Sequence, residues 1–133
     1  MAHPKMFDDD DPVLARVRRI ALSFPDAADK VSHGQPAFFT TKVFAYYGGS
    51  QKLPAGGHVR HDASLLVLAP ADERQALLQD PRFFTPMYLG PSGWVGLRLD
   101  DQTDWTEVRE LIDASYRLTA GVRRVRRLDA GDA

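Results

Sequence analysis

Two amphipathic stripes, one near each end of the 133-residue chain, most constrain what it can fold into. In the first, apolar side chains recur at steps of three and four residues over residues 13–24, while three arginines fall off the stripe. Asp11 can cap the free amides of such a helix, Pro12 suits its first position, and Pro25 ends it. The pattern predicts a helix that buries one face.

The second stripe predicts a longer helix that begins after Asp104. Glu107 follows Asp104 by three residues, which is the capping-box spacing with Asp in place of Ser or Thr. Apolar side chains then keep to one face over residues 105–119, and Gly121 is a typical residue just beyond a helix end. Ser115 lies on this face and is expected to pack on the sheet rather than to act as a nucleophile.

Between the stripes, short apolar runs separated by turn residues predict strands. The runs are rich in aromatic and β-branched residues, and the last one alternates as a strand covered on one face does. The predicted strands are 37–41, 43–47, 63–69, 83–89 and 94–99. A short helix is predicted over 72–78, turns at 48–50 and 90–93, and loops over 26–36 and 54–57.

This order of elements predicts an α+β fold. An antiparallel sheet of about five strands, covered on one face by the N-terminal and C-terminal helices, would give both stripes a covering layer. A chain of this length suits a single core, which we expect over residues 12–120. Residues 1–11 are expected to form an acidic tail, and residues 121–133 a basic and then flexible tail that frays.

Composition argues against several classes of function. Without cysteine there is no disulfide framework, thiolate zinc site or thiol nucleophile. No apolar run reaches the length of a signal peptide or membrane span, so we expect a cytoplasmic location without membrane contact. His58 and His61 beside Asp62 would point to opposite faces of an extended chain, so no metal site is expected. No phosphate loop, nucleophile elbow or zinc-protease motif is present, so no cofactor is expected and an enzyme is unsupported.

Three segments have the order and spacing of a known family. The first is ALSFPDAADKVSHGQPAFFTTKVFA, with a proline turn and a histidine-glycine-proline stretch that leads into a hairpin. The others are GWVGLRLD and DWTEVRELIDASYRL. Together they resemble the MmcQ/YjbR family over about residues 12–120. The resemblance implies a CyaY-like, or frataxin-like, α-β(5)-α fold of the double-wing type.

The resemblance says less about function than about fold. Members of the family are often described as DNA-binding, by analogy to double-wing modules, and no catalytic residues carry over. Frataxin-type iron binding relies on an acidic helix and edge. The first helix here has Arg16, Arg18 and Arg19 instead, which leaves only the acidic run over residues 8–11 for such a role.

Charge makes DNA binding one candidate function. The formal net charge of −1 gives no global attraction to a polyanion, but the basic residues are unevenly distributed. In a double-wing geometry, the hairpin loops at 48–57 and 90–93 would lie along a duplex backbone. The candidate phosphate contacts are Lys42, Lys52, Arg60, Arg123 and Arg124.

The alternative is a non-enzymatic domain that binds another protein or a small ligand. A pocket that holds His33 and Lys42 beside Tyr88 or Trp94 would favour this alternative. The competing interpretation of SHGQPAFFTTKVF is a turn that leads into a buried hairpin, with His33 in a structural role. Lys42 then remains the residue of that segment to test for function.

Overall fold

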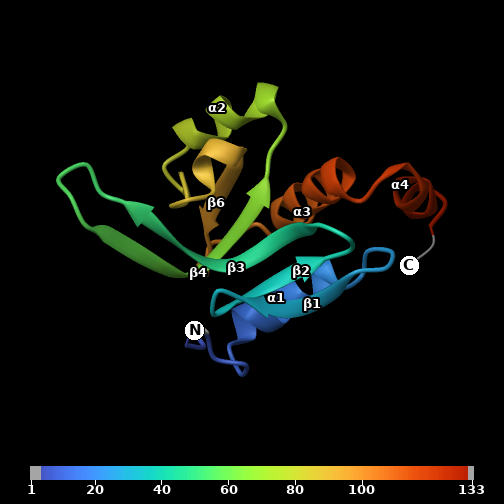
Figure 1. Ribbon diagram of the computed structural model, residues 1–133, viewed down its shortest axis with the longest axis horizontal. Helices are drawn as coiled ribbons and strands as arrows, with labels where there is room; N and C mark the ends of the chain where they lie inside the picture. Colours follow the sequence, from blue (N-terminus) through green and yellow to red (C-terminus); the bar gives the residue numbers. More distant parts are fainter. Residues whose placement is uncertain (1–3, 132–133) are drawn as a thin grey trace.

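A computed structural model describes residues 4–131, which form an open six-stranded sheet with four α-helices (Figure 1). The strands are β1 (Ala28–Ser32), β2 (Gln35–Phe39), β3 (Val43–Lys52), β4 (His58–Leu68), β5 (Phe83–Phe84) and β6 (Trp94–Arg98). The helices are α1 (Pro12–Ala21), α2 (Ala71–Gln79), α3 (Trp105–Thr119) and α4 (Val122–Asp129), with a short 3-10 helix, η1, at Gly90–Ser92. The predicted α+β class is confirmed.

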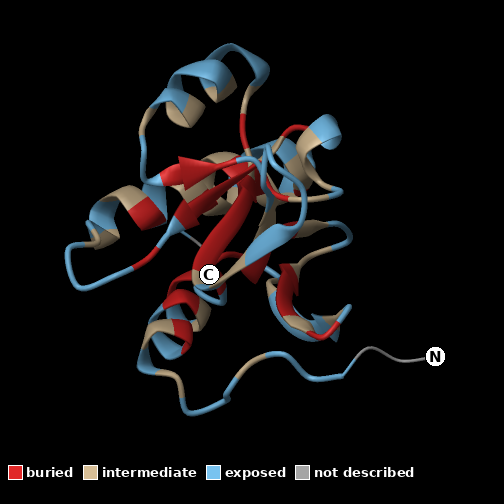
Figure 2. Cartoon of the chain, turned by 90° about the vertical axis from the view of Figure 1, so that its left-hand side faces the viewer, coloured by how far each residue is buried: buried red, intermediate tan, exposed pale blue. Residues whose placement is uncertain are grey.

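The strands lie in the order β1-β2-β3-β4-β6-β5, and each neighbouring pair is antiparallel. Helices α1 and α3 both pack on the central strands β3 and β4 and also contact each other. Buried residues therefore concentrate on the central strands and on the inner sides of these helices (Figure 2). Both amphipathic stripes cover the same face of the sheet, as the sequence predicts.

The two long helices begin where the sequence predicts. The side chain of Asp11 accepts a hydrogen bond from the Val13 amide at 2.9 Å. The side chain of Asp104 accepts from the amides of Thr106 and Glu107, at 3.0 and 3.3 Å. Each cap satisfies amides that have no partner within the helix. Ser115 is fully buried on the sheet side of α3, as expected.

The predicted loop over residues 26–36 is wrong, because it contains β1 and the turn to β2. β1 pairs with β2 through a tight turn in which His33 and Gly34 both have positive φ, at 52° and 83°. That combination is the two-residue hairpin turn whose twist matches the strands. β1 is the exposed edge strand, so its sequence ADKVS has no apolar alternation to detect. The sheet has six strands for this reason rather than the predicted five.

Other predicted boundaries are also wrong: α1 ends at Ala21 rather than just before Pro25, and β4 begins at His58 rather than at residue 63. Residues 48–50 do not form a turn but continue β3, with an irregularity in the pairing to β4 between Tyr47 and Gly49, where Gly48 has positive φ. Of the predicted strand over 83–89, only β5 pairs with β6. Beyond it, the Met87 amide donates to the Ser50 carbonyl of β3 at 2.8 Å. This long-range contact diverts the segment away from its neighbour β6.

The segment expected to fray at the C-terminus instead forms α4. Its side chains are held by ion pairs: Arg124 and Arg127 both bind Asp26, at 3.0 and 2.9 Å, and Asp129 binds Arg117 at 2.8 Å. These partners are distant in sequence, which is why local composition does not reveal them. The outermost residues of the two expected tails, 1–3 and 132–133, lie outside the described residues.

Candidate functional site

The face of the sheet opposite the two long helices has its own row of side chains. Strand pairing places Ala37 opposite Tyr46, Tyr46 opposite Leu66, and Gly96 opposite both Leu66 and Phe84. None of these residues belongs to the main core cluster between the sheet and the helices. Since neighbouring residues of a strand point to opposite faces, the row forms the surface of the helix-free face.

The segment from 85 to 89 turns this face into a groove. Two strands, β4 and β6, separate β5 from β3, yet Pro86 forms a bridge with Gln51 of β3, so the segment reaches back across the sheet. The N-terminal segment closes another side, where the Met6 amide donates to the Gly34 carbonyl at 2.8 Å. The resulting cavity has a volume of about 500 Å³. Its lining residues are Met6, Ser32, His33, Gln35, Tyr46, Gly49, Ser50, Arg60, Leu66, Pro86, Met87, Tyr88 and Leu89.

The floor of the groove is apolar and aromatic. Tyr46 packs against Trp94 with ring centroids 5.3 Å apart, and Leu66 is only 2% exposed. Burial raises the pKa of the Tyr46 hydroxyl, so that side chain stays neutral. Gly49 lies close to Leu66, because a β-carbon at Gly49 would come within 2.9 Å of the leucine methyl groups. The glycine leaves the space above the floor open.

Beside the floor, the ring of Phe84 packs against that of His61. Their ring centroids are 4.4 Å apart, and His61 Nε2 lies 3.0 Å from the side-chain oxygen of Gln51. Burial, followed by the positive charge of Arg98, lowers the pKa of His61, which favours the neutral imidazole. A neutral His61 suits a position beside an aromatic ring and an amide. This part of the site is therefore a support rather than a charged centre.

Two residues on the rim have unusual backbone conformations. His33 and Tyr88 are two of the three non-glycine residues with positive φ among residues 4–131, at 52° and 67°. Both line the groove, although 55 positions separate them in the sequence. The hairpin turn requires a positive φ at His33, where Asn or Gly is more usual. Tyr88 is 89% exposed, so no burial of its ring offsets the strain at that position.

Arg60 supplies a positive charge at the groove. Its Nε donates to an Asp62 carboxylate oxygen at 2.6 Å, and its Nη2 donates to the Met6 carbonyl at 3.3 Å. The Arg60 side chain is 20% exposed and that of Asp62 is 82% exposed. The guanidinium is therefore held at the groove wall with its partner on the solvent side.

A second recess adjoins the groove and shares part of its wall. It has a volume of about 680 Å³ and is lined by Gln51, Lys52, Thr85, Pro86, Met87 and Tyr88. Because Pro86, Met87 and Tyr88 line both hollows, the segment from 85 to 89 separates one from the other. Lys52 brings a second positive charge to this side of the molecule.

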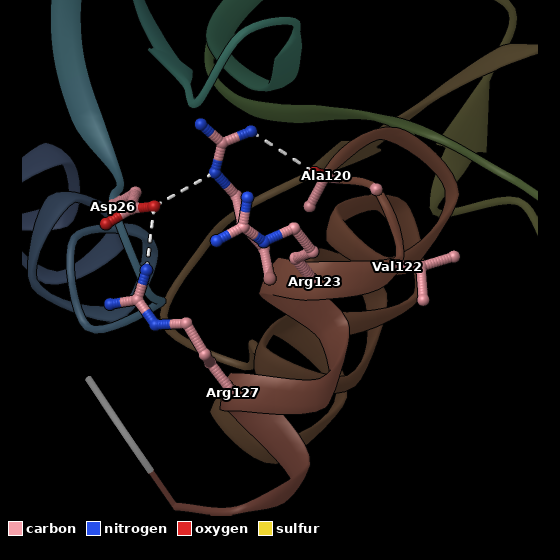
Figure 3. A pocket seen from close by; sticks show the side chains of 7 residues that line it. Asp26, Ala120, Val122, Arg123 and Arg127 are labelled. Carbon is pink, nitrogen blue, oxygen red and sulfur yellow. Dashed lines mark hydrogen bonds and ion pairs between the residues drawn. The ribbon is translucent and has the colours of Figure 1, made fainter.

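A separate basic cavity of about 500 Å³ lies where α3 meets α4 (Figure 3). Arg124 and Arg127 converge there on Asp26, and Arg124 also donates to the Ala120 carbonyl at 3.2 Å. These two arginines lower the pKa of Asp26, which keeps its carboxylate charged. Much of the positive charge in this cavity is thus already neutralised within the chain.

The structure separates the basic residues that the sequence singled out. Lys52 and Arg60 belong to the β3–β4 hairpin, on the groove side. Lys42 is exposed in the turn between β2 and β3, beside Thr41, whose hydroxyl accepts from Arg124 at 3.2 Å. The five candidates therefore form two groups, one on the hairpin and one with Arg123 around α4.

The candidate pocket residues are partly brought together. His33 and Tyr88 line the same groove, and Trp94 joins them indirectly by packing on Tyr46. Lys42 is not among the lining residues. Sequence reasoning missed Met6, Ser50 and Met87, since only tertiary contacts bring these three distant segments to one face. A cluster of His, Asp or Glu suited to hold a metal ion is absent from residues 4–131, and among those residues no helix is long and apolar enough to span a bilayer.

The fold and the groove define a class of protein: an open antiparallel sheet with both long helices on one face and a ligand-sized hollow on the other. The YjbR family model matches residues 22–118, so the chain belongs to the YjbR family, as the resemblance in its sequence predicts. A crystal structure of a protein from Pseudomonas syringae, solved by the Northeast Structural Genomics Consortium, is similar in fold. Its TM-score is 0.51 at 20% sequence identity, with 72% of this chain and 79% of that chain covered. The curated proteins contain no match to this chain.

Proposed function

We propose that this chain is a non-enzymatic binding protein that takes a small organic ligand in the groove on the helix-free face. The observation that carries the proposal is Tyr88, an aromatic residue that is 89% exposed on a strained backbone at the groove rim. Backbone strain without a packing gain is typical of functional positions. An exposed tyrosine offers a large contact surface at small cost in side-chain entropy.

The dimensions and chemistry of the groove support the same proposal. A volume of about 500 Å³ lies within the usual range for small-molecule sites. The floor is apolar, and a few polar groups at the rim, among them Ser32, Gln35 and Ser50, could orient a ligand. Met6 and Met87 add flexible side chains that adapt to the shape of a ligand.

The variant Tyr88→Asn tests the proposal because it separates binding from stability. Asn tolerates a positive φ, so the free energy of unfolding should stay within about 1 kcal/mol of the native value or rise. Aromatic fragments that shift the backbone amide NMR signals of Ser50 and Met87 in the native protein should bind the variant about five- to tenfold more weakly. Val122→Asn, an exposed apolar position on α4, is the matched control. Equal fragment affinity in Tyr88→Asn and the native protein would contradict the proposal.

DNA binding is the second candidate, and the shape of the β3–β4 hairpin favours it. The hairpin extends well beyond the rest of the sheet (Figure 1), as a wing that follows a duplex backbone would. Lys52 is exposed at the end of its first strand, next to the loop over residues 53–57. The DNA candidate is less well supported than the groove, since the formal net charge of −1 gives no overall attraction to a polyanion.

If the hairpin binds DNA, Lys52→Gln should weaken duplex binding to a similar extent for all sequences. The dependence of log affinity on log salt concentration should also become shallower by about 1. Lys30→Gln, an exposed lysine on the edge strand β1, is the control and should change neither quantity. Fluorescence anisotropy with a labelled duplex measures both. Undetectable binding at about 50 mM salt removes the DNA candidate and leaves the groove unaffected.

A further inference from the structure

We infer that the ligand of the groove is a small organic acid, whose carboxylate binds Arg60 while its apolar body lies over Tyr46 and Leu66; this inference rests on the binding function proposed for the groove. Three observations lead to it: the sign of the charges around the groove, the way in which Arg60 is held, and the apolar floor beside it.

The charged side chain in the lining of the groove is a cation. The lining residues include Arg60 but no aspartate or glutamate, and Asp62, which binds Arg60, lies on the solvent side. The adjoining recess adds Lys52 and again no carboxylate. The molecule as a whole carries slightly more acidic than basic residues, so this local excess of positive charge is not a consequence of composition. A site lined in this way attracts anions and disfavours cations.

Arg60 has the geometry of an anion-binding residue rather than of a freely moving surface cation. Asp62 and the Met6 carbonyl each accept a hydrogen bond from one of its five N–H groups. These two bonds fix the guanidinium and leave the other N–H groups for a ligand. Gly48 makes room for this arrangement, because a β-carbon there would come within 2.9 Å of Arg60 Nη2. A planar guanidinium held in place loses little freedom when it binds a carboxylate with two parallel hydrogen bonds.

Asp62 does not prevent this binding. Its side chain is 82% exposed, so solvent and salt screen much of its attraction for Arg60. Arg60 is more enclosed, at 20% exposure, and faces the groove on which Tyr46 and Leu66 form the floor. A ligand carboxylate at Arg60 would thus have a charge-assisted bond on one side and an apolar surface for its body on the other.

A matched pair of probes tests the inference: naphthalene carboxylate and the neutral naphthalene carboxamide, which share size and shape. The acid is expected to bind at least about tenfold more tightly than the amide, since a hydrogen bond to a charged group is the stronger kind. Arg60→Gln should remove this preference, and Arg60→Lys should keep part of it. Arg126→Gln, an exposed arginine on α4, is the matched control and should leave the preference intact. Titrations followed by backbone amide NMR signals give affinity and location together.

The titrations distinguish a failure of the organic-acid inference from a failure of the proposed binding groove. Equal affinity for acid and amide, with signals shifted at Ser50 and Met87, would overturn the organic-acid inference and leave the proposed binding groove standing. Signals shifted by the acid only around Arg123 and Arg124 would place anion binding in the α4 cavity and also overturn the inference. Lys52→Gln keeps the inference testable if the Arg60 variants misfold. This substitution should weaken binding of the acid but not of the amide. Equal weakening of binding for both probes would count against the inference.

Discussion

Replacement of Ser115 by alanine is expected to lower the free energy of unfolding by about 3 kcal/mol. Ser115 is fully buried. Its hydroxyl accepts a hydrogen bond from the Leu68 amide of β4 at 3.0 Å and donates one to the Phe44 carbonyl of β3 at 2.7 Å. One side chain of α3 therefore satisfies a main-chain group on each of the two central strands. Alanine fills nearly the same space but leaves both main-chain groups without this partner, and buried polar groups without partners are costly.

Urea unfolding followed by tryptophan fluorescence measures the effect. Ser92→Ala, on the exposed 3-10 helix η1, is the matched control and should change the free energy of unfolding by less than about 0.5 kcal/mol. An equal effect of the two substitutions would show that the hydroxyl of Ser115 does not hold the helix to the sheet. The sequence predicts that Ser115 packs; only the structure shows that it also bridges two strands.

The second large effect is expected where Phe84 lies over Gly96. A β-carbon at Gly96 would come within 2.4 to 2.7 Å of three ring atoms of Phe84, far closer than real carbon contacts allow. Gly96→Ala should therefore lower the free energy of unfolding by about 2 kcal/mol. Phe84→Ala should lower it by about 4 kcal/mol, because Phe84 is only 2% exposed and its removal leaves a cavity.

The double variant distinguishes this contact from unrelated damage. Without the ring, the new methyl group at position 96 has space and fills part of the cavity. The free energy of unfolding of the double variant should then be about 2 kcal/mol higher than the sum of the two single effects predicts. Strict additivity, measured by urea unfolding, would mean that Phe84 and Gly96 do not contact each other in solution. Since Phe84 precedes the segment over 85–89, the same variants should also loosen the groove wall.

Most regular elements that carry a strong local signal were predicted correctly. The stripe after Asp11 and the stripe after Asp104 each combine a helical period with a cap, and each forms a helix that starts there. The central strands are apolar enough to be recognised, and the short helix α2 is also found. These signals are local, since caps and periodicity involve residues within a few positions of one another.

The errors share one physical cause, which is dependence on distant partners. β1 is an exposed edge strand defined by its pairing with β2, and residues 85–89 leave the sheet because main-chain contacts draw Pro86 and Met87 to β3. α4 is basic and only its Leu128 packs against the core, yet Asp26, about a hundred positions earlier, binds two of its arginines. None of these contacts can be inferred from the local pattern.

For the candidate site, the sequence pointed to single residues but not to their arrangement. It singled out His33, Tyr88 and Trp94 as possible neighbours, and Arg60 as a cation that binds phosphate. Tertiary structure places His33, Tyr88 and Arg60 around one groove and places Lys42 near α4.

The sequence alone thus determined the α+β class, the family resemblance and the two helices that cover one face, because short-range patterns encode them. Only the tertiary structure decided that the other face is hollowed, since a groove is formed by side chains from the N-terminal segment, the β1–β2 turn, β3, β4 and the segment over 85–89. The tertiary structure also fixes where the positive charge of the groove lies. Arg60 donates to Asp62 on its own strand and to the main-chain carbonyl of Met6, and only folding brings Met6 near Arg60.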